Sequence, residues 1–66
     1  MQILLNGESR IIPENSTAQT LLESLGIQAK RLAMEVNLEI VPRSLFSQTA
    51  LQSGDKVEIV QAIGGG

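Results

Sequence analysis

The sequence predicts a single α+β domain in which one helix packs against one face of a β-sheet. The first observation behind this prediction is one amphipathic helical segment, which lies between short segments with the composition of β-strands. The second is length: a chain of 66 residues buries only ~60% of the surface that it exposes when unfolded, so it has no room for two cores. We therefore expect one domain over residues 1–63 and a glycine tail over residues 64–66.

The chain begins with two short β-prone segments, residues 2–6 and 9–13. The pair Asn6-Gly7 lies between them, and both residue types tolerate the positive φ angles of a tight hairpin turn. Pro13 has no backbone N–H to donate, which places it at the end of the second strand or at an edge of the sheet. The segment therefore predicts a hairpin, whose register stays open.

The helix is predicted over residues 17–25, where apolar side chains recur at helical spacing. The residues of this apolar stripe are Ala18, Leu21, Leu22 and Leu25. Ser16 and Gln19 have the spacing of a capping box, which satisfies two free backbone donors at a helix start, so Ser16 is the expected N-cap. Gly26 supplies the left-handed residue that ends many helices, and Ile27 is expected to pack back on the helix.

The second half of the chain predicts three further strands. Alternation of apolar and other residues over 32–36 indicates a half-buried strand, and residues 40–41 form a short strand that Pro42 ends. Residues 43–53 show no sustained period, so we expect a loop over the sheet. The side chains expected to anchor this loop are Leu45, Phe46 and Leu51. A Gly-Asp turn then leads into the last strand, residues 56–63.

The composition excludes several classes of function. The sequence has no cysteine and no histidine, which removes thiol nucleophiles, disulfides, zinc-finger ligand sets and the commonest general base. The acidic residues Glu35, Glu39 and Glu58 lack the spacing of a metal-binding loop. A net charge of −2 with only five scattered cations argues against nucleic acid binding. We therefore expect a protein that is not an enzyme and holds no metal.

The opening residues, Met1 to Asn6, lack the basic flank and long apolar stretch of a secretory signal. The chain also has no apolar run long enough to span a membrane. We expect a cytoplasmic protein that does not interact with a membrane.

The last three residues are glycines, and two interpretations of them are open. One is a frayed chain end, because glycine raises backbone entropy. The other begins with sterics: residues without a Cβ can extend about 10 Å through a channel too narrow for any side chain. A partner's active site would then meet the α-carboxylate of Gly66. A carboxylate is a poor electrophile until an enzyme converts it to an acyl-adenylate, so Gly66 would be a substrate group.

Three segments in order resemble the thiamine-biosynthesis sulfur carriers, a family of the ubiquitin-like β-grasp superfamily. The segments are MQILLNG (1–7), VNLEIVPR (36–43) and GDKVEIV (54–60). The resemblance covers the whole chain. It implies a mixed sheet with the element order β-β-α-β-β-β, packed on one helix and followed by a flexible Gly-Gly-Gly tail.

The resemblance also implies that the chain is a substrate of other proteins. In the family's cycle an adenylating enzyme activates the terminal carboxylate with MgATP, and sulfur from a sulfur-donor protein replaces the adenylate to give a thiocarboxylate. Thiazole synthase then takes this sulfur. In that role Gly66 would hold the acyl group, while Gly64 and Gly65 would thread into the partner with it. The chain itself would bind no cofactor, because ATP and Mg²⁺ belong to the adenylating enzyme.

A docking surface can be placed on the last strand. If Val57 faces the helix, alternation along the strand puts every second residue after Lys56 on the opposite face. These residues are Glu58, Val60 and Ala62. They lead directly to the glycines, so we expect them to dock a partner, and Arg43 is a further candidate for pairing with an acidic partner surface.

Two alternatives have the same fold. One is the small subunit of molybdopterin synthase, which also ends in Gly-Gly but donates sulfur to a pterin precursor. The other is a non-catalytic β-grasp binding module, which needs no free terminus. The block Val41-Pro42-Arg43 and the residues 61–63 before the glycines look more like the thiamine type.

Overall fold

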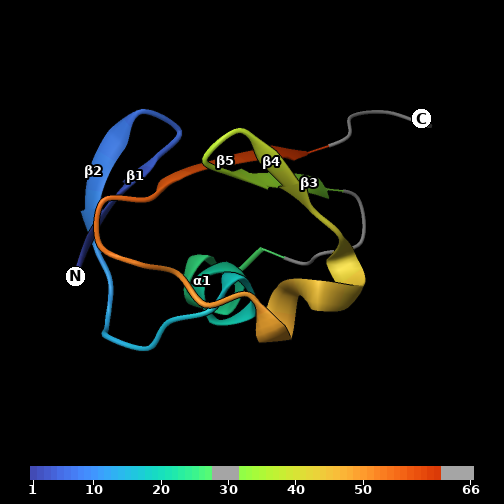
Figure 1. Ribbon diagram of the computed structural model, residues 1–66, viewed down its shortest axis with the longest axis horizontal. Helices are drawn as coiled ribbons and strands as arrows, with labels where there is room; N and C mark the ends of the chain where they lie inside the picture. The colour runs from blue at the N-terminus through green and yellow to red at the C-terminus, as the bar shows by residue number, and fades with distance from the viewer. Residues whose placement is uncertain (28–31, 62–66) are drawn as a thin grey trace.

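The computed structural model describes residues 1–27 and 32–61, which form a β-sheet with a helix on one face (Figure 1). The strands are β1 (Gln2–Leu5), β2 (Glu8–Ile11), β3 (Leu32–Val36), β4 (Glu39–Val41) and β5 (Lys56–Gln61). The helices are α1 (Ala18–Leu25) and the 3-10 helix η2 (Arg43–Gln48). The α+β class and the order β-β-α-β-β-β are therefore confirmed, with η2 as an addition.

The sheet has the strand order β2-β1-β5-β3-β4, so the last strand of the chain lies at its centre. β5 pairs in parallel with β1, with Leu4 opposite Lys56 and Leu5 opposite Val57. Its other neighbour, β3, is antiparallel, as are the pairs β1–β2 and β3–β4. The sheet is thus mixed, and β5 joins two hairpins that lie far apart in the sequence (Figure 1).

Both hairpins turn on an asparagine with a positive φ. Asn6 (50°) and Gly7 (83°) form the predicted turn between β1 and β2, while Asn37 (53°) and Leu38 (70°) join β3 to β4. Asparagine tolerates this left-handed region better than other non-glycine residues do. Pro13 lies beyond the end of β2, which is an edge strand, so its missing N–H removes no bond from the sheet.

Helix α1 ends as predicted but begins one residue later. The N-cap is Thr17, whose Oγ1 accepts from the Thr20 backbone N–H at 3.1 Å, while the Thr20 hydroxyl oxygen accepts from the Thr17 N–H at 2.8 Å. The predicted Ser16 cap is wrong because the buried Ser16 hydroxyl instead donates to the Pro13 carbonyl at 2.6 Å. Gly26 is left-handed at φ 70°, and the N–H of Ile27 bonds to Leu22 O at 3.1 Å, which closes the helix.

The segment predicted as a loop contains η2, which follows Pro42. Phe46 and Leu51 are buried, as expected of anchors, but Leu45 is 43% exposed and does not anchor the segment. A 3-10 helix has three residues per turn, so the residue next to a buried side chain points away from the core. The last predicted strand is seen as far as Gln61, and its expected residues 62 and 63 lie outside the described part of the chain.

The core lies between the sheet and the two helices. Its buried apolar residues are Ile3, Ile12, Ala18, Leu21, Leu22, Met34, Phe46, Leu51 and Val57. Figure 1 shows α1 and η2 on the same side of the sheet, and within the described residues no element covers the opposite side. In the described part of the chain, one face of the sheet is therefore left without a covering element.

Candidate functional site

The exposed face of the central strands carries the residues that the sequence singled out. On β5, Val57 is fully buried while Glu58 and Val60 point away from the core, and Val60 is 66% exposed. The register pairs Val60 with Ala33, and both Glu58 and Ile40 with Glu35. Paired residues of antiparallel strands point to the same side of a sheet. We call the resulting surface the outer face; its residues are Ala33, Glu35, Ile40, Glu58 and Val60.

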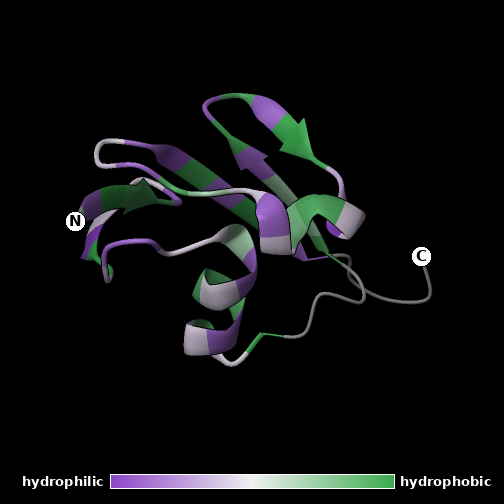
Figure 2. Cartoon of the chain, turned by 60° about the horizontal axis from the view of Figure 1, so that its bottom comes forward, coloured by the Kyte–Doolittle hydropathy of each residue, from purple (hydrophilic) through white to green (hydrophobic). Residues whose placement is uncertain are grey.

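The apolar surface on and beside the outer face is larger than the sequence suggested. Ile40 on β4 is 72% exposed, and Leu38 in the β3–β4 turn is 84% exposed. Figure 2 shows the hydrophobic colour on β4 at the free edge of the sheet. The sequence alone did not reveal either residue: the pattern over residues 40–41 predicts a short strand but not which side of the sheet Ile40 faces, and Leu38 belongs to neither predicted strand. The missing signal is the cross-strand register, which places Ile40 opposite Glu35 and in the same row as Glu58.

The acidic part of the outer face is a pair of like charges. Glu35 and Glu58 are directly opposite on β3 and β5. Among the residues that the structure describes, neither forms an ion pair. Like charges directly opposite each other destabilise a sheet, whereas a cation contributed by a partner would stabilise the same pair. The outer face is therefore complementary to a partner surface that combines apolar area with basic side chains.

Three predicted site features cannot be located on this face. Ala62 and the glycines Gly64, Gly65 and Gly66 lie outside the described residues. Arg43 is exposed but belongs to η2, after the end of β4, and so is not one of the strand residues of the outer face. Glu58 and Val60 are thus the predicted docking residues that the structure brings together.

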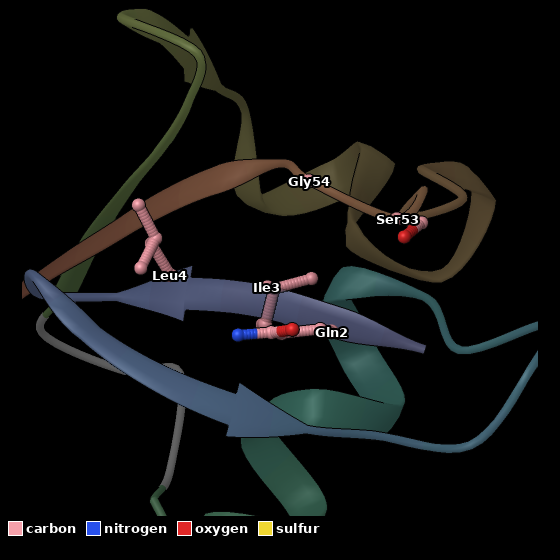
Figure 3. A pocket seen from close by; sticks show the side chains of 5 residues that line it. All are labelled: Gln2, Ile3, Leu4, Ser53 and Gly54. Atoms are coloured by element: carbon pink, nitrogen blue, oxygen red, sulfur yellow. The ribbon is translucent and has the colours of Figure 1, made fainter.

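Two shallow hollows flank the exposed side chain of Leu4. One, of about 290 Å³, is lined by Gln2, Ile3, Leu4, Ser53 and Gly54 (Figure 3). None of these five side chains is ionisable, so this hollow offers no acid or base. The other, of about 240 Å³, is lined by Leu4, Gly7, Lys56, Val57 and Glu58 and borders the outer face. Neither has the converging polar groups of a catalytic pocket.

Other kinds of site find no support in the described residues. Across residues 1–27 and 32–61, no three His, Cys, Asp or Glu side chains gather as a metal site requires. Within the same ranges, no helix is long and apolar enough to cross a membrane.

Comparison with known proteins agrees with this geometry. The model of the ThiS family matches residues 3–66. The sulfur carrier protein ThiS of Escherichia coli is 36% identical over 66 residues, which cover the whole of both chains. A crystal structure of the thiamine biosynthesis protein ThiS from Geobacter metallireducens superposes with a TM-score of 0.87 at 32% identity, again over the full length of both chains.

A third relative is much longer. A thiazole synthase from Paramagnetospirillum magneticum is 47% identical over 66 residues, which are 100% of this chain and only 20% of that protein. The chain therefore corresponds to about a fifth of that relative's length.

A mixed five-stranded sheet packed on one helix, together with the full-length structural match, defines a protein of the β-grasp class. The chain belongs to the ThiS family, which includes the sulfur carrier protein ThiS of Escherichia coli. This membership confirms the resemblance seen in the sequence, and it favours the thiamine type over the pterin type and the plain binding module.

Proposed function

We propose that this chain carries sulfur to thiazole synthase as a thiocarboxylate on Gly66. The observation that carries the proposal is the double role of β5. This one strand presents Glu58 and Val60 on the outer face and ends at Gln61, five residues before Gly66 in the sequence. A partner that docks on the outer face is thereby held close to the acyl group.

The proposed chemistry takes place on the partners. A carboxylate oxygen of Gly66 attacks the α-phosphorus of ATP, and pyrophosphate leaves with Mg²⁺ to give an acyl-adenylate. Sulfur from a sulfur-donor protein, at the oxidation level of sulfide, then attacks the acyl carbon, and AMP leaves. The thiocarboxylate formed is a softer and better nucleophile than the carboxylate. Sulfur has the same advantage in cysteine chemistry, where the thiolate is the nucleophile. Gly64, Gly65 and Gly66 have no side chains. Side chains at these positions would obstruct a narrow channel to the nucleotide.

Docking would be shared between the apolar and acidic parts of the outer face. Ile40 and Val60 offer apolar area, which drives association in proportion to the area removed from water. Glu35 and Glu58 offer a negative charge that steers a basic partner and selects its orientation. Arg43 is the first residue of η2, which follows β4 in the sequence, and we propose it as a contact at the rim of the outer face.

Thiazole synthase is the proposed acceptor because a relative of that name contains a segment 47% identical to this chain. A carrier and an acceptor that occur in one polypeptide meet at a high effective concentration.

Intact-protein mass tests the proposal. The untagged chain is incubated with a thiamine-type adenylating enzyme, MgATP and a sulfur donor, and a variant that lacks Gly66 is treated in parallel. We expect the full chain alone to gain the mass difference of one oxygen replaced by one sulfur. The modified chain should then support thiazole formation by thiazole synthase.

No mass gain with an enzyme that activates another member of the family would contradict the proposal. A gain in both chains would place the modification elsewhere than Gly66.

A further inference from the structure

The two turn asparagines do more than permit the hairpins to turn. Asn6 and Asn37 belong to different hairpins, yet both contact the central strand β5, one from each side. In each case a backbone N–H donates to a β5 carbonyl at 2.8 Å: Asn6 to Val57 and Asn37 to Lys56. The side chains of both asparagines then form hydrogen bonds in place of backbone hydrogen bonds of the sheet.

The Asn6 side chain extends the parallel pairing of β1 with β5. Leu4 N donates to Asp55 O at 2.9 Å and Asn6 N to Val57 O at 2.8 Å, which is the two-residue step of a parallel ladder. The next step would reach Ile59, but the chain has already turned away at Asn6. There the side chain takes over: Asn6 Oδ1 accepts from Ile59 N at 2.8 Å, and Asn6 Nδ2 donates to Ile59 O at 3.3 Å.

The Asn37 side chain performs the same substitution on the other side. Asn37 follows Val36, which is paired with Val57, so Asn37 comes opposite Lys56. Two residues of a hydrogen-bonded antiparallel pair exchange N–H and carbonyl bonds. Here Asn37 N donates to Lys56 O. In return, Lys56 N donates to Asn37 Oδ1 at 3.0 Å instead of to a backbone carbonyl. Asn37 Nδ2 also donates to Asp55 Oδ1 at 3.0 Å.

These hydrogen bonds act on β5, the strand that carries the proposed docking residues. Glu58 and Val60 of the outer face lie between and just beyond the bonded residues Lys56 and Ile59. β5 also leads toward Gly66. Fixing both sides of β5 therefore fixes the positions of Glu58 and Val60.

We propose that Asn6 and Asn37 are positioning residues for acyl activation: their side-chain amides hold β5 in register, so that a docked partner receives the terminal carboxylate in one place. This inference rests on the function proposed above. It goes beyond that function by assigning a role to two turn residues that the proposed docking and chemistry do not use. Orientation of reacting groups contributes strongly to rate, and small displacements are costly.

The test compares Asn6→Gly and Asn37→Gly in the full chain. Glycine adopts the positive φ at no steric cost, so the turns are kept and only the amides are lost. Asn15→Gly is the matched control, because Asn15 also has a positive φ (67°) but is exposed and makes no side-chain hydrogen bond. Asn6→Asp is the conservative variant, which keeps the acceptor for Ile59 N–H and loses only the donor.

The first measurement is amide hydrogen exchange by NMR on the carrier alone. We expect the Ile59 amide in Asn6→Gly and the Lys56 amide in Asn37→Gly to exchange roughly tenfold faster, as loss of one hydrogen bond predicts. The Asn15→Gly variant should exchange like the parent at both amides, and Asn6→Asp should keep most of the protection at Ile59. Parent-like exchange at Ile59 and Lys56 in the glycine variants would overturn the proposal.

The second measurement is the rate of adenylation with each variant under conditions where all are folded. Because the outer-face side chains are unchanged, we expect kcat to fall roughly three- to tenfold while KM for the carrier stays nearly constant, with partial recovery in Asn6→Asp. Faster exchange without any change in kcat would overturn the positioning role. A parent chain that the enzyme never activates would instead contradict the proposed function, and the exchange data would still stand.

Discussion

At the scale of single residues, two valines of β5 show how one strand serves two purposes. Val57 is fully buried against the helix, whereas Val60 is 66% exposed on the outer face. They are the same residue type on one strand, and the odd spacing between them decides which faces the core. A change at Val60 is therefore expected to affect a partner, and a change at Val57 the fold.

Val60→Lys is predicted to weaken docking without unfolding the domain. A charge at the centre of an apolar contact must be desolvated, so KM for the carrier in the adenylation reaction should rise roughly tenfold, about 1.4 kcal/mol. The free energy of unfolding should change by less than about 0.5 kcal/mol, because the side chain is exposed.

The matched control is Ile11→Lys. Ile11 on β2 is β-branched and 74% exposed; its partner Gln2 adjoins the buried Ile3, so Ile11 points to the same side of the sheet as Val60 but lies at the opposite edge from β4. Its substitution should leave KM unchanged. Equal effects of the two variants would mean that general charge, and not the outer face, governs binding.

At the scale of elements, α1 depends on its two ends, because an eight-residue helix is too short to be stable by itself. The Thr17 and Thr20 hydroxyls close the first turn, and Gly26 closes the last. Both ends lie on the far side of the sheet from the outer face (Figure 1). Changes here should alter stability and leave docking intact.

Thr17→Ala is predicted to lower the free energy of unfolding by about 1 kcal/mol, the usual contribution of an N-cap side chain. Urea denaturation measures this difference. Thr17→Ser retains the accepting oxygen and should recover most of the loss. If alanine and serine behaved alike, the hydroxyl bond to Thr20 N–H would not be the source of the stability.

The sequence predicted those elements whose signals are local. The Asn6-Gly7 turn, the Gly26 stop and the alternation along β3 each depend on the residues' own backbone preferences. The N-cap and η2 were not predicted correctly: Ser16 has a competing local acceptor three residues earlier, and η2 depends on a tertiary contact. The Pro13 carbonyl takes the hydroxyl of Ser16, and burial of Phe46 favours a helical turn in a segment without a clear period.

The candidate site was likewise predictable only where its signals are local. Exposure of Glu58 and Val60 followed from alternation along one strand. Ile40 and the facing of Glu35 toward Glu58 required knowledge of which strands are neighbours, and in which register. The roles proposed for Asn6 and Asn37 also depend on contacts across strands, which a residue pattern within one segment does not contain.

At the scale of the whole molecule, part of the negative charge is placed where it opposes the stability of the sheet. The chain has a net charge of −2, and two of its seven acidic residues oppose each other on β3 and β5. A sheet optimised for stability alone would place opposite charges there.

Glu35→Lys tests this balance. Replacing the like pair by an opposite pair should raise the free energy of unfolding by about 0.5 kcal/mol. The same variant should associate more slowly with the adenylating enzyme at low salt, because it removes negative charge from the face that steers the partner. Thermal unfolding and stopped-flow association at two salt concentrations measure the two effects.

Glu35→Gln is the control, since it removes the repulsion without introducing a cation. It should fall between the parent and Glu35→Lys in both measurements. A variant that gained stability and kept its association rate at every salt concentration would show that the acidic pair has no part in docking.

The central place of β5 also has a consequence for biosynthesis. Until β5 has been made, the sheet exists only as two separate hairpins, and a two-stranded hairpin alone is marginally stable in water. The contacts that unite them, such as Leu4 with Lys56, join residues from opposite ends of the chain, and such distant contacts form late. A ribosome that stalls before β5 would therefore release a chain that neither folds nor displays the outer face. Partners would encounter that face only on chains translated through β5, and truncated products would be left to proteases.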